Sequence, residues 1–219
     1  MSRKPKPSGR KRPFDKGRRA EEYARSSRNL RAKRLILIVC EAKETEPNYF
    51  TSFYNVRRPA SASIKVLRGG QAKALPARTI ERAKQERDQL LWDEHRDQAW
   101  CVFDTEQAGT HADLLALVKD ARRYQLHVAI SNPAFEYWFL LHFEQTDRPF
   151  GNAQELTDVL RGHLPQYTKS MDAFARLDKL TENALANAKA LRKRSGESWE
   201  NYPCPSTGAD LLVREILRR

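Results

Sequence analysis

Apolar and polar positions alternate along the chain in blocks that predict strands and helices in turn. The clearest strand is RLILIVC at residues 34–40, an unbroken apolar run that is typical of a strand covered on both faces in a parallel sheet. Further strands are predicted at residues 61–67, 98–104 and 126–132. Amphipathic or apolar helices follow these strands at residues 45–56, 77–94, 111–125 and 133–143. This order predicts an α/β fold with a mainly parallel four-stranded sheet, helices on both faces and right-handed crossovers.

The pattern changes after Gly151, where helical periodicity continues without a further predicted strand. Helical segments are predicted at residues 152–164, 171–196 and 208–219, and a proline-rich loop precedes the last of them. We therefore expect an α/β domain at residues 34–150 and a helical C-terminal extension at residues 151–219 that packs on the same domain.

Charge is concentrated at one end of the chain. Residues 1–34 carry fourteen Lys or Arg and three acidic residues, so they supply +11 of the formal net charge of +12. Because they offer few aliphatic side chains to bury, residues 1–33 are predicted to be a disordered basic arm. Such an arm suits nucleic-acid phosphates, since each neutralised phosphate releases a counterion. A tail that only improves solubility is the alternative that charge alone leaves open.

Neither a targeting segment nor a membrane span is evident in the sequence. No apolar h-region follows the basic residues, and no apolar run is long enough to cross a bilayer, so we expect a soluble protein without a membrane partner. The cysteines Cys40, Cys101 and Cys204 are odd in number and lack metal-ligand spacing. They favour a reducing, cytoplasmic location.

Acidic residues follow two of the predicted strands at the same edge of the sheet. Glu41 leaves the first strand, and Asp104 and Glu106 leave the third. Ligands bind at this carboxyl edge of open parallel sheets, and residues two apart in an extended segment project to the same side. If the two strands are neighbours, we expect the three carboxylates to share one hard cation, Mg²⁺ or Mn²⁺. Ordinary hydrophilic strand ends are the alternative.

Five further residues are candidates for binding the metal or the substrate. Glu136 lies just inside the apolar helix and is a candidate for a further metal ligand. Arg68 ends the second strand and Lys169 lies in a loop, and both are candidates for phosphate binding, although a solvated lysine is the simpler interpretation of Lys169. Asn132 is expected to cap the next helix, whose N-terminus would favour an anion. His142 is a candidate for substrate binding, but it shares a helical stripe with aromatic residues, so a buried core histidine is the alternative interpretation.

Two more glutamates follow Glu41 closely. Thr45 is the expected N-cap of the first helix, Glu44 lies near that cap, and Glu46 falls in the first helical turn. A carboxylate in that turn favours the positive end of the helix dipole. We therefore interpret Glu46 as a capping residue and Glu41 as the functional one.

The segments that carry these residues resemble successive motifs of the RloB family. In chain order they are LILIVCEAKETEPNYF, WCVFDTE, SNPAFEYWFLLHF and NYPCPSTGADLLVREI, and they leave out only the basic arm. The family is similar to Toprim-type proteins and occurs with bacterial restriction and abortive-infection loci. The resemblance therefore implies a Toprim-like fold and a role in defence against phage.

Toprim domains use a glutamate after the first strand and an Asp-x-Asp pair after the third, which correspond here to Glu41, Asp104 and Glu106. The resemblance implies that Glu41 is a general acid or base while Asp104 and Glu106 hold Mg²⁺ against a phosphodiester. Two positions depart from the pattern. Ala42 replaces the usual glycine after the glutamate, and Glu106 replaces the last aspartate with a side chain one methylene longer.

Two functions are compatible with these features. The resemblance implies a Mg²⁺-dependent nuclease in antiphage defence, with RNA such as tRNA, or DNA, as its substrate. The alternative is a non-catalytic protein that binds nucleic acid or a defence complex. The sequence contains no Walker lysine motif, so any nucleotide hydrolysis would come from a partner ATPase. Another defence protein and a second copy of the chain are the other partners that both functions allow.

Overall fold

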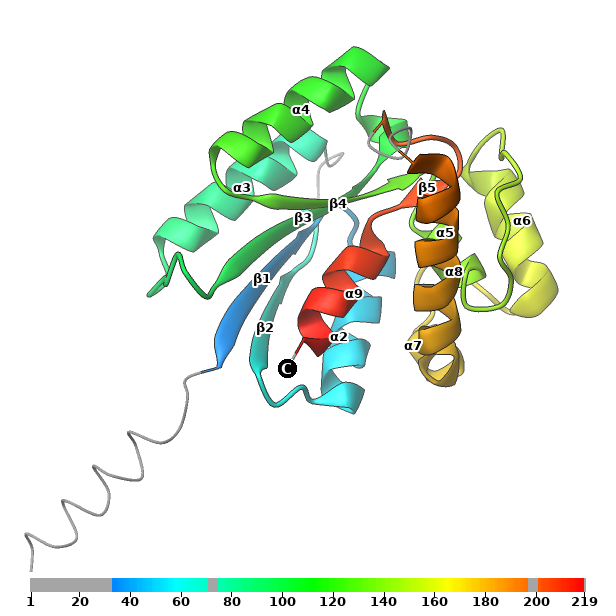
Figure 1. Ribbon diagram of the computed structural model, residues 1–219, viewed down its shortest axis with the longest axis horizontal. Helices are drawn as coiled ribbons and strands as arrows, with labels where there is room; N and C mark the ends of the chain where they lie inside the picture. The colour runs from blue at the N-terminus through cyan, green and yellow to red at the C-terminus, as the bar shows by residue number, and fades with distance from the viewer. Residues whose placement is uncertain (1–32, 71–74, 197–200, 219) are drawn as a thin grey trace, which may run out of the picture. The chain divides into compact units, whose positions relative to one another are not determined.

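The computed structural model describes residues 33–70, 75–196 and 201–218. Residues 1–32, which make up most of the predicted basic arm, lie outside the described residues. From Lys33 onward the chain forms one unit in which helices cover both faces of a sheet (Figure 1). No helix in the described ranges combines the length and the apolar character needed to cross a membrane.

The sheet has five strands. They are β1 (Arg34–Cys40), β2 (Ala62–Leu67), β3 (Gln98–Asp104), β4 (His127–Asn132) and β5 (Ser206–Thr207). Their order is β2-β1-β3-β4-β5, and the first four are parallel to one another. The predicted α/β class and the mainly parallel sheet are therefore confirmed. Because β1 lies between two strands and beneath helices on both faces, its last five residues are all buried.

The fifth strand corrects the prediction of a four-stranded sheet. β5 pairs antiparallel with β4, with Ser131 opposite Thr207 and Asn132 opposite Ser206. The side-chain hydroxyl oxygens of Ser131 and Thr207 lie 3.0 Å apart and join the two strands further. A two-residue strand in a proline-rich loop is too short to show a period, so only its pairing with β4 identifies it.

Helices cover the two faces of the sheet in separate groups (Figure 1). They are α2 (Thr45–Arg57), α3 (Pro76–Asp88), α4 (His111–Arg123), α5 (Glu136–Leu140), α6 (Ala153–His163), α7 (Phe174–Leu177), α8 (Thr181–Ser195) and α9 (Ala209–Leu217). Residues Leu37 and Val39 of β1 pack in the core cluster with α3 and α4. Ile36 and Ile38 point to the opposite face, in the larger core cluster with α2, α9 and the other C-terminal helices. Alternate side chains of this one strand therefore pack into the two core clusters on opposite faces of the sheet.

Two of the helices are shorter than their sequence pattern predicts. α3 ends at Asp88, so Leu91 lies beyond it and is fully exposed. Instead of another helical turn, the chain makes a loop in which the Asp97 carboxylate accepts hydrogen bonds from the backbone N–H groups of Asp93 and Leu35. α5 begins only at Glu136, after the residues that were predicted to open it.

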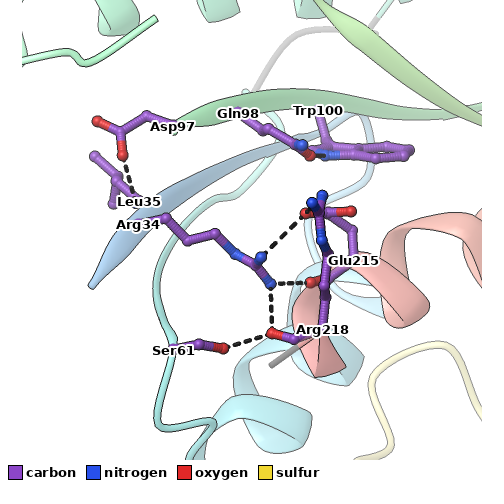
Figure 2. Close-up of polar contacts among 8 residues, drawn as sticks. All are labelled: Arg34, Leu35, Ser61, Asp97, Gln98, Trp100, Glu215 and Arg218. Carbon is purple, nitrogen blue, oxygen red and sulfur yellow. Dashed lines mark hydrogen bonds and ion pairs between the residues drawn. The ribbon is translucent and has the colours of Figure 1, made fainter. Parts of the chain in front are cut away.

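Arg34 holds the last helix to the start of the first strand (Figure 2). Its guanidinium forms an ion pair with Glu215 at 3.3 Å and donates hydrogen bonds to the carbonyl oxygens of Glu215 and Arg218. The Ser61 hydroxyl donates to the same Arg218 carbonyl at 2.5 Å. Segments from the two ends of the described chain are therefore joined at the amino edge of the sheet.

We expect Arg34→Met to lower the free energy of unfolding by about 1–3 kcal/mol, because it removes the ion pair to the largely buried Glu215 carboxylate and two hydrogen bonds to carbonyl oxygens. The Arg34 and Glu215 side chains are only 14% and 17% exposed. Arg148→Met is the matched control, since Arg148 and its partner Glu155 are 59% and 40% exposed, and it should cost less than about 1 kcal/mol. Urea denaturation measures both, and equal losses would contradict the anchoring role of Arg34.

Candidate functional site

The carboxyl ends of β1 and β3 bring Glu41 and Asp104 together. The strands are parallel neighbours, with Cys40 opposite Val102, and the Glu41 N–H extends the ladder to the Val102 carbonyl oxygen at 2.9 Å. The Asp104 N–H in turn donates to Glu41 Oε2 at 3.2 Å. The first and third strands are therefore neighbours, which was the condition for the acidic residues to meet, and the pairing places Glu41 and Asp104 side by side.

Two further acidic residues complete a group that we call the carboxylate cluster: Glu41, Glu46, Asp104 and Glu136. Glu46 lies in the first turn of α2, and Glu136 is the first residue of α5. The Glu41, Glu46 and Glu136 residues are only 6%, 2% and 2% exposed. The buried Tyr167 hydroxyl donates a hydrogen bond of 2.8 Å to Glu136 Oε1. Four elements thus bring four carboxyl groups to one buried place.

Burial makes the charged forms of these carboxyl groups costly. Loss of hydration raises the pKa of Glu41 to about 7, although the hydrogen bond from the Asp104 N–H opposes the shift. Loss of hydration also raises the pKa of Glu46 to about 8 and that of Asp104 well above its usual range. Repulsion from the other carboxylates of the cluster adds to both shifts, and the positive charge of Lys169 reduces them. Near neutral pH the cluster therefore retains protons that exposed carboxyl groups would lose.

Three oxygens of the cluster are buried and have no hydrogen-bond partner among the described residues, namely Glu41 Oε1, Glu46 Oε2 and Asp104 Oδ1. Such unsatisfied atoms are rare in folded proteins, and a hard cation with oxygen ligands would satisfy them. Within the described residues, no three His, Cys, Asp or Glu side chains already form a metal-binding group. The donor chemistry fits Mg²⁺ or Mn²⁺, and the side chains would have to draw closer together around the ion.

Glu106 lies outside the carboxylate cluster. After Asp104 the chain turns into a 3₁₀ helix at Thr105–Gln107, so the segment is not extended and the rule that sends alternate side chains to one side does not apply. Glu106 Oε1 instead accepts a hydrogen bond of 3.0 Å from the backbone N–H of Ala153, the first residue of α6. The structure therefore places this exposed carboxylate at a helix N-terminus, where the helix dipole stabilises it.

Glu46 is the member of the cluster that sequence reasoning missed. The N-cap position of α2 is occupied by the exposed Glu44, whose side chain makes no capping hydrogen bond within the described residues. Glu46 is buried instead and faces the other carboxylates. The available signal was its position in the first turn of the helix that follows β1, because that turn lies at the same edge of the sheet as the strand end.

The other predicted residues fall into different places. Asn132 does not cap α5, because its Oδ1 accepts from the Thr105 hydroxyl at 3.0 Å and its Nδ2 donates to the Tyr202 carbonyl oxygen at 2.7 Å. His142 is fully buried, its Nδ1–H donates to the Trp138 carbonyl oxygen at 2.9 Å, and burial lowers its pKa to about 4. This is the core histidine that the sequence allowed, out of reach of a substrate.

Arg68 lines a pocket of about 680 Å³ that adjoins the carboxylate cluster. We call it the arginine pocket, because Arg68, Arg78, Arg82 and Lys43 line it together with Glu41. It lies at the carboxyl edge between β1, β2 and α3. Glu41 therefore belongs to both sites and is the point at which the negative cluster meets the positive pocket.

Gly69 brings the loop after β2 into direct contact with the backbone at Glu41. A Cβ atom at Gly69 would lie 1.8 Å from the Glu41 carbonyl oxygen, so no other residue fits without a shift of the backbone. The Gly69 N–H donates to the Ala42 carbonyl oxygen at 2.8 Å. This close approach fixes the segment that carries Glu41.

A protein-family model described as RloB-like protein matches residues 36–216. The chain belongs to the RloB-like family. The resemblance that the sequence motifs indicated is therefore confirmed. No curated protein and no solved structure matches the chain. The carboxylate cluster and the arginine pocket both lie within the RloB-like region, and the basic arm lies outside it.

The raised pKa values of the cluster predict that this RloB-like protein becomes less stable as pH rises. Between the usual glutamate value of 4.5 and the raised values of about 7 and 8, the folded state binds more protons than the unfolded state. The free energy of unfolding should therefore fall by about 1–3 kcal/mol from roughly pH 5.5 to pH 8. Thermal unfolding across this range measures the effect.

Asp104→Asn and Glu46→Gln are the variants that separate the cluster from other titrating groups. Each removes one buried carboxyl, so each should flatten the pH dependence and raise the melting temperature at the alkaline end. Added Mg²⁺ should raise the melting temperature of the wild type more than that of Asp104→Asn. The pH prediction would be refuted by a wild-type stability that does not change with pH. It would also be refuted if the stability of both variants changed with pH as much as that of the wild type.

The contact at Gly69 predicts a large difference between two adjacent glycines. Gly69→Ala should cost about 1–3 kcal/mol or more, because the added methyl group collides with backbone atoms that cannot move aside without displacing Glu41. Gly70→Ala is the control, since an added Cβ there meets nothing within 4 Å. Urea denaturation of both variants measures the difference, and similar stabilities would disprove the close-contact role of Gly69.

Proposed function

We propose that this RloB-like protein is a metal-dependent nuclease of the Toprim type that hydrolyses phosphodiester bonds of RNA or DNA in defence against phage. The carboxylate cluster carries the proposal: four acidic side chains lie at the carboxyl edge of a parallel sheet, and three of them have a buried oxygen with no partner in the part of the chain that the structure describes. Because buried carboxylates without partners destabilise a fold, their presence together favours a role in binding a cation. A glutamate after β1 and an aspartate after β3 also support the Toprim comparison.

Glu46, Asp104 and Glu136 are the residues that would hold Mg²⁺ or Mn²⁺. When bound, such an ion stabilises negative charge on phosphoryl oxygens and lowers the pKa of a water molecule. Tyr167 would orient Glu136 through its hydrogen bond to Oε1. Lys169, whose charge acts on both Glu46 and Asp104, would bind a phosphate oxygen beside them.

Glu41 is the residue suited to proton transfer. Hydrolysis adds water across a P–O bond, so the attacking water loses one proton and the leaving oxygen gains one. With a pKa of about 7, Glu41 populates both protonation states near neutral pH and can accept or donate a proton. The Asp104 N–H donates to one of its carboxylate oxygens, and the other oxygen has no partner within the described ranges.

The experiment is cleavage of labelled single-stranded DNA, duplex DNA and total tRNA by the purified full chain, with Mg²⁺ or Mn²⁺ against EDTA. We expect metal-dependent cleavage of at least one substrate. Glu41→Gln should reduce its rate by about 10²–10⁴-fold, because it removes the proton-transfer group. Asp104→Asn should reduce the rate similarly by weakening the binding of the metal.

Two other glutamine variants test the boundaries of the site. Glu81→Gln on α3 is a neutral control, because this glutamate side chain is 58% exposed and its polar contacts within the described residues are to Lys84 and Gln85 of its own helix. Glu106→Gln tests the residue that the Toprim pattern favours and that the structure places at α6. We expect it to cleave at nearly the wild-type rate. Intact nucleic-acid binding without metal-dependent cleavage would refute the nuclease and favour the non-catalytic alternative.

A further inference from the structure

The arginine pocket has more positive charge than the fold requires. Within the described residues, none of Arg68, Arg78 and Arg82 forms an ion pair with a carboxylate. Elsewhere in the same described chain, arginines such as Arg34, Arg57 and Arg161 do have carboxylate partners. Three unpaired guanidinium groups around one pocket favour an anionic ligand from outside the chain.

Two of these arginines are held in place by the backbone rather than by acidic side chains. Arg68 Nη1 donates to the Lys43 carbonyl oxygen at 2.8 Å, and Arg82 donates to the Arg68 carbonyl oxygen. The Gly69 contact fixes the loop between them against the Glu41 backbone. The guanidinium groups are therefore positioned without neutralisation of their charge, which lowers the entropy that binding would cost.

The pocket is close to the carboxylate cluster. Its lining includes Glu41 of the cluster and Cys40, the last residue of β1, together with Arg68 and Arg82. Both guanidinium groups therefore lie near the end of β1, one residue before Glu41. A nucleic-acid strand whose reacting phosphate lies at the cluster would bring a neighbouring phosphate to the arginines.

We propose that the arginine pocket binds a phosphate group of the substrate strand adjacent to the phosphodiester that is cleaved at the carboxylate cluster. This inference rests on the proposed nuclease function, and it adds a specificity rule to it. Arginine recognises phosphate through paired N–H donors, and several arginines together suit a group with more than one negative charge. A substrate with only one phosphate should therefore be cleaved poorly, because it leaves the pocket empty.

The test is binding of short single-stranded oligonucleotides, as DNA and as RNA, measured by fluorescence anisotropy in EDTA. The double variant Arg78→Gln/Arg82→Gln should bind at least about tenfold more weakly than the wild type. The number of counterions released on binding, given by the slope of log affinity against log salt concentration, should fall by about two, because two phosphate contacts are lost. Replacement of the same two residues by lysine should restore part of the charge-dependent affinity but not the full affinity.

Arg122→Gln/Arg123→Gln is the matched control, since both are exposed arginines at the end of α4 that form no carboxylate ion pair within the described chain. It removes the same charge and should reduce affinity far less than the Arg78→Gln/Arg82→Gln variant does. Equal losses in the two would overturn the proposal, because they would show only the effect of net charge. Circular dichroism confirms that both variants are folded.

Oligonucleotides with a 5′-phosphate and with a 5′-hydroxyl distinguish two sources of the phosphate. If the Arg78→Gln/Arg82→Gln variant loses affinity only for the 5′-phosphorylated form, the pocket binds the phosphate at a strand end. If it loses affinity equally for both forms, the pocket binds an internal phosphodiester. Because EDTA prevents metal-dependent cleavage, the result is independent of the nuclease proposal. If the arginine variants lose binding and the wild type never cleaves, the pocket is correct and the nuclease is wrong.

Discussion

The buried position of β1 is the constraint on which the site depends. The strand lies between β2 and β3 and has a core cluster on each face, so the chain that leaves it is still within the protein when it reaches Glu41. A carboxylate after an exposed strand would be hydrated. Here one carboxylate oxygen accepts a backbone hydrogen bond, and the other accepts none from the residues that the structure describes. Placing an acid at the end of a strand that is buried on both faces therefore creates a chemically unusual group.

Three further acidic side chains of the cluster lie near Glu41, and their charges repel one another. Glu46, Asp104 and Glu136 approach from α2, β3 and α5, and each adds to the repulsion or to the loss of hydration. Protons can offset this cost, and so can a cation. The arginine pocket shares Glu41 with the cluster, yet its residues Arg68 and Arg82 donate to carbonyl oxygens rather than to these carboxylates. Opposite charges thus remain next to each other without neutralising each other, an arrangement suited to a ligand that contacts both.

The helical segments after Gly151 contribute to the site as well as to the core. Tyr167, in the loop after α6, reaches Glu136 with its hydroxyl, and the Lys169 backbone accepts a hydrogen bond from Thr45 at the start of α2. α9 returns to the start of β1, where Arg34 holds it at the opposite edge of the sheet (Figure 2). The C-terminal third of the chain therefore secures both ends of the strand that carries Glu41.

The sequence by itself determined the strand order along the chain, the parallel character of the sheet and the position of Glu41 and Asp104 at its carboxyl edge. These features follow from local periodicity, because a fully apolar run indicates a strand buried on both faces. The tertiary structure alone decided which acidic side chains meet. A 3₁₀ turn sends Glu106 to α6, and the approach of α2 buries Glu46. The two-residue β5 and the arginine pocket are also visible only in the tertiary structure, because each depends on contacts between segments far apart in sequence.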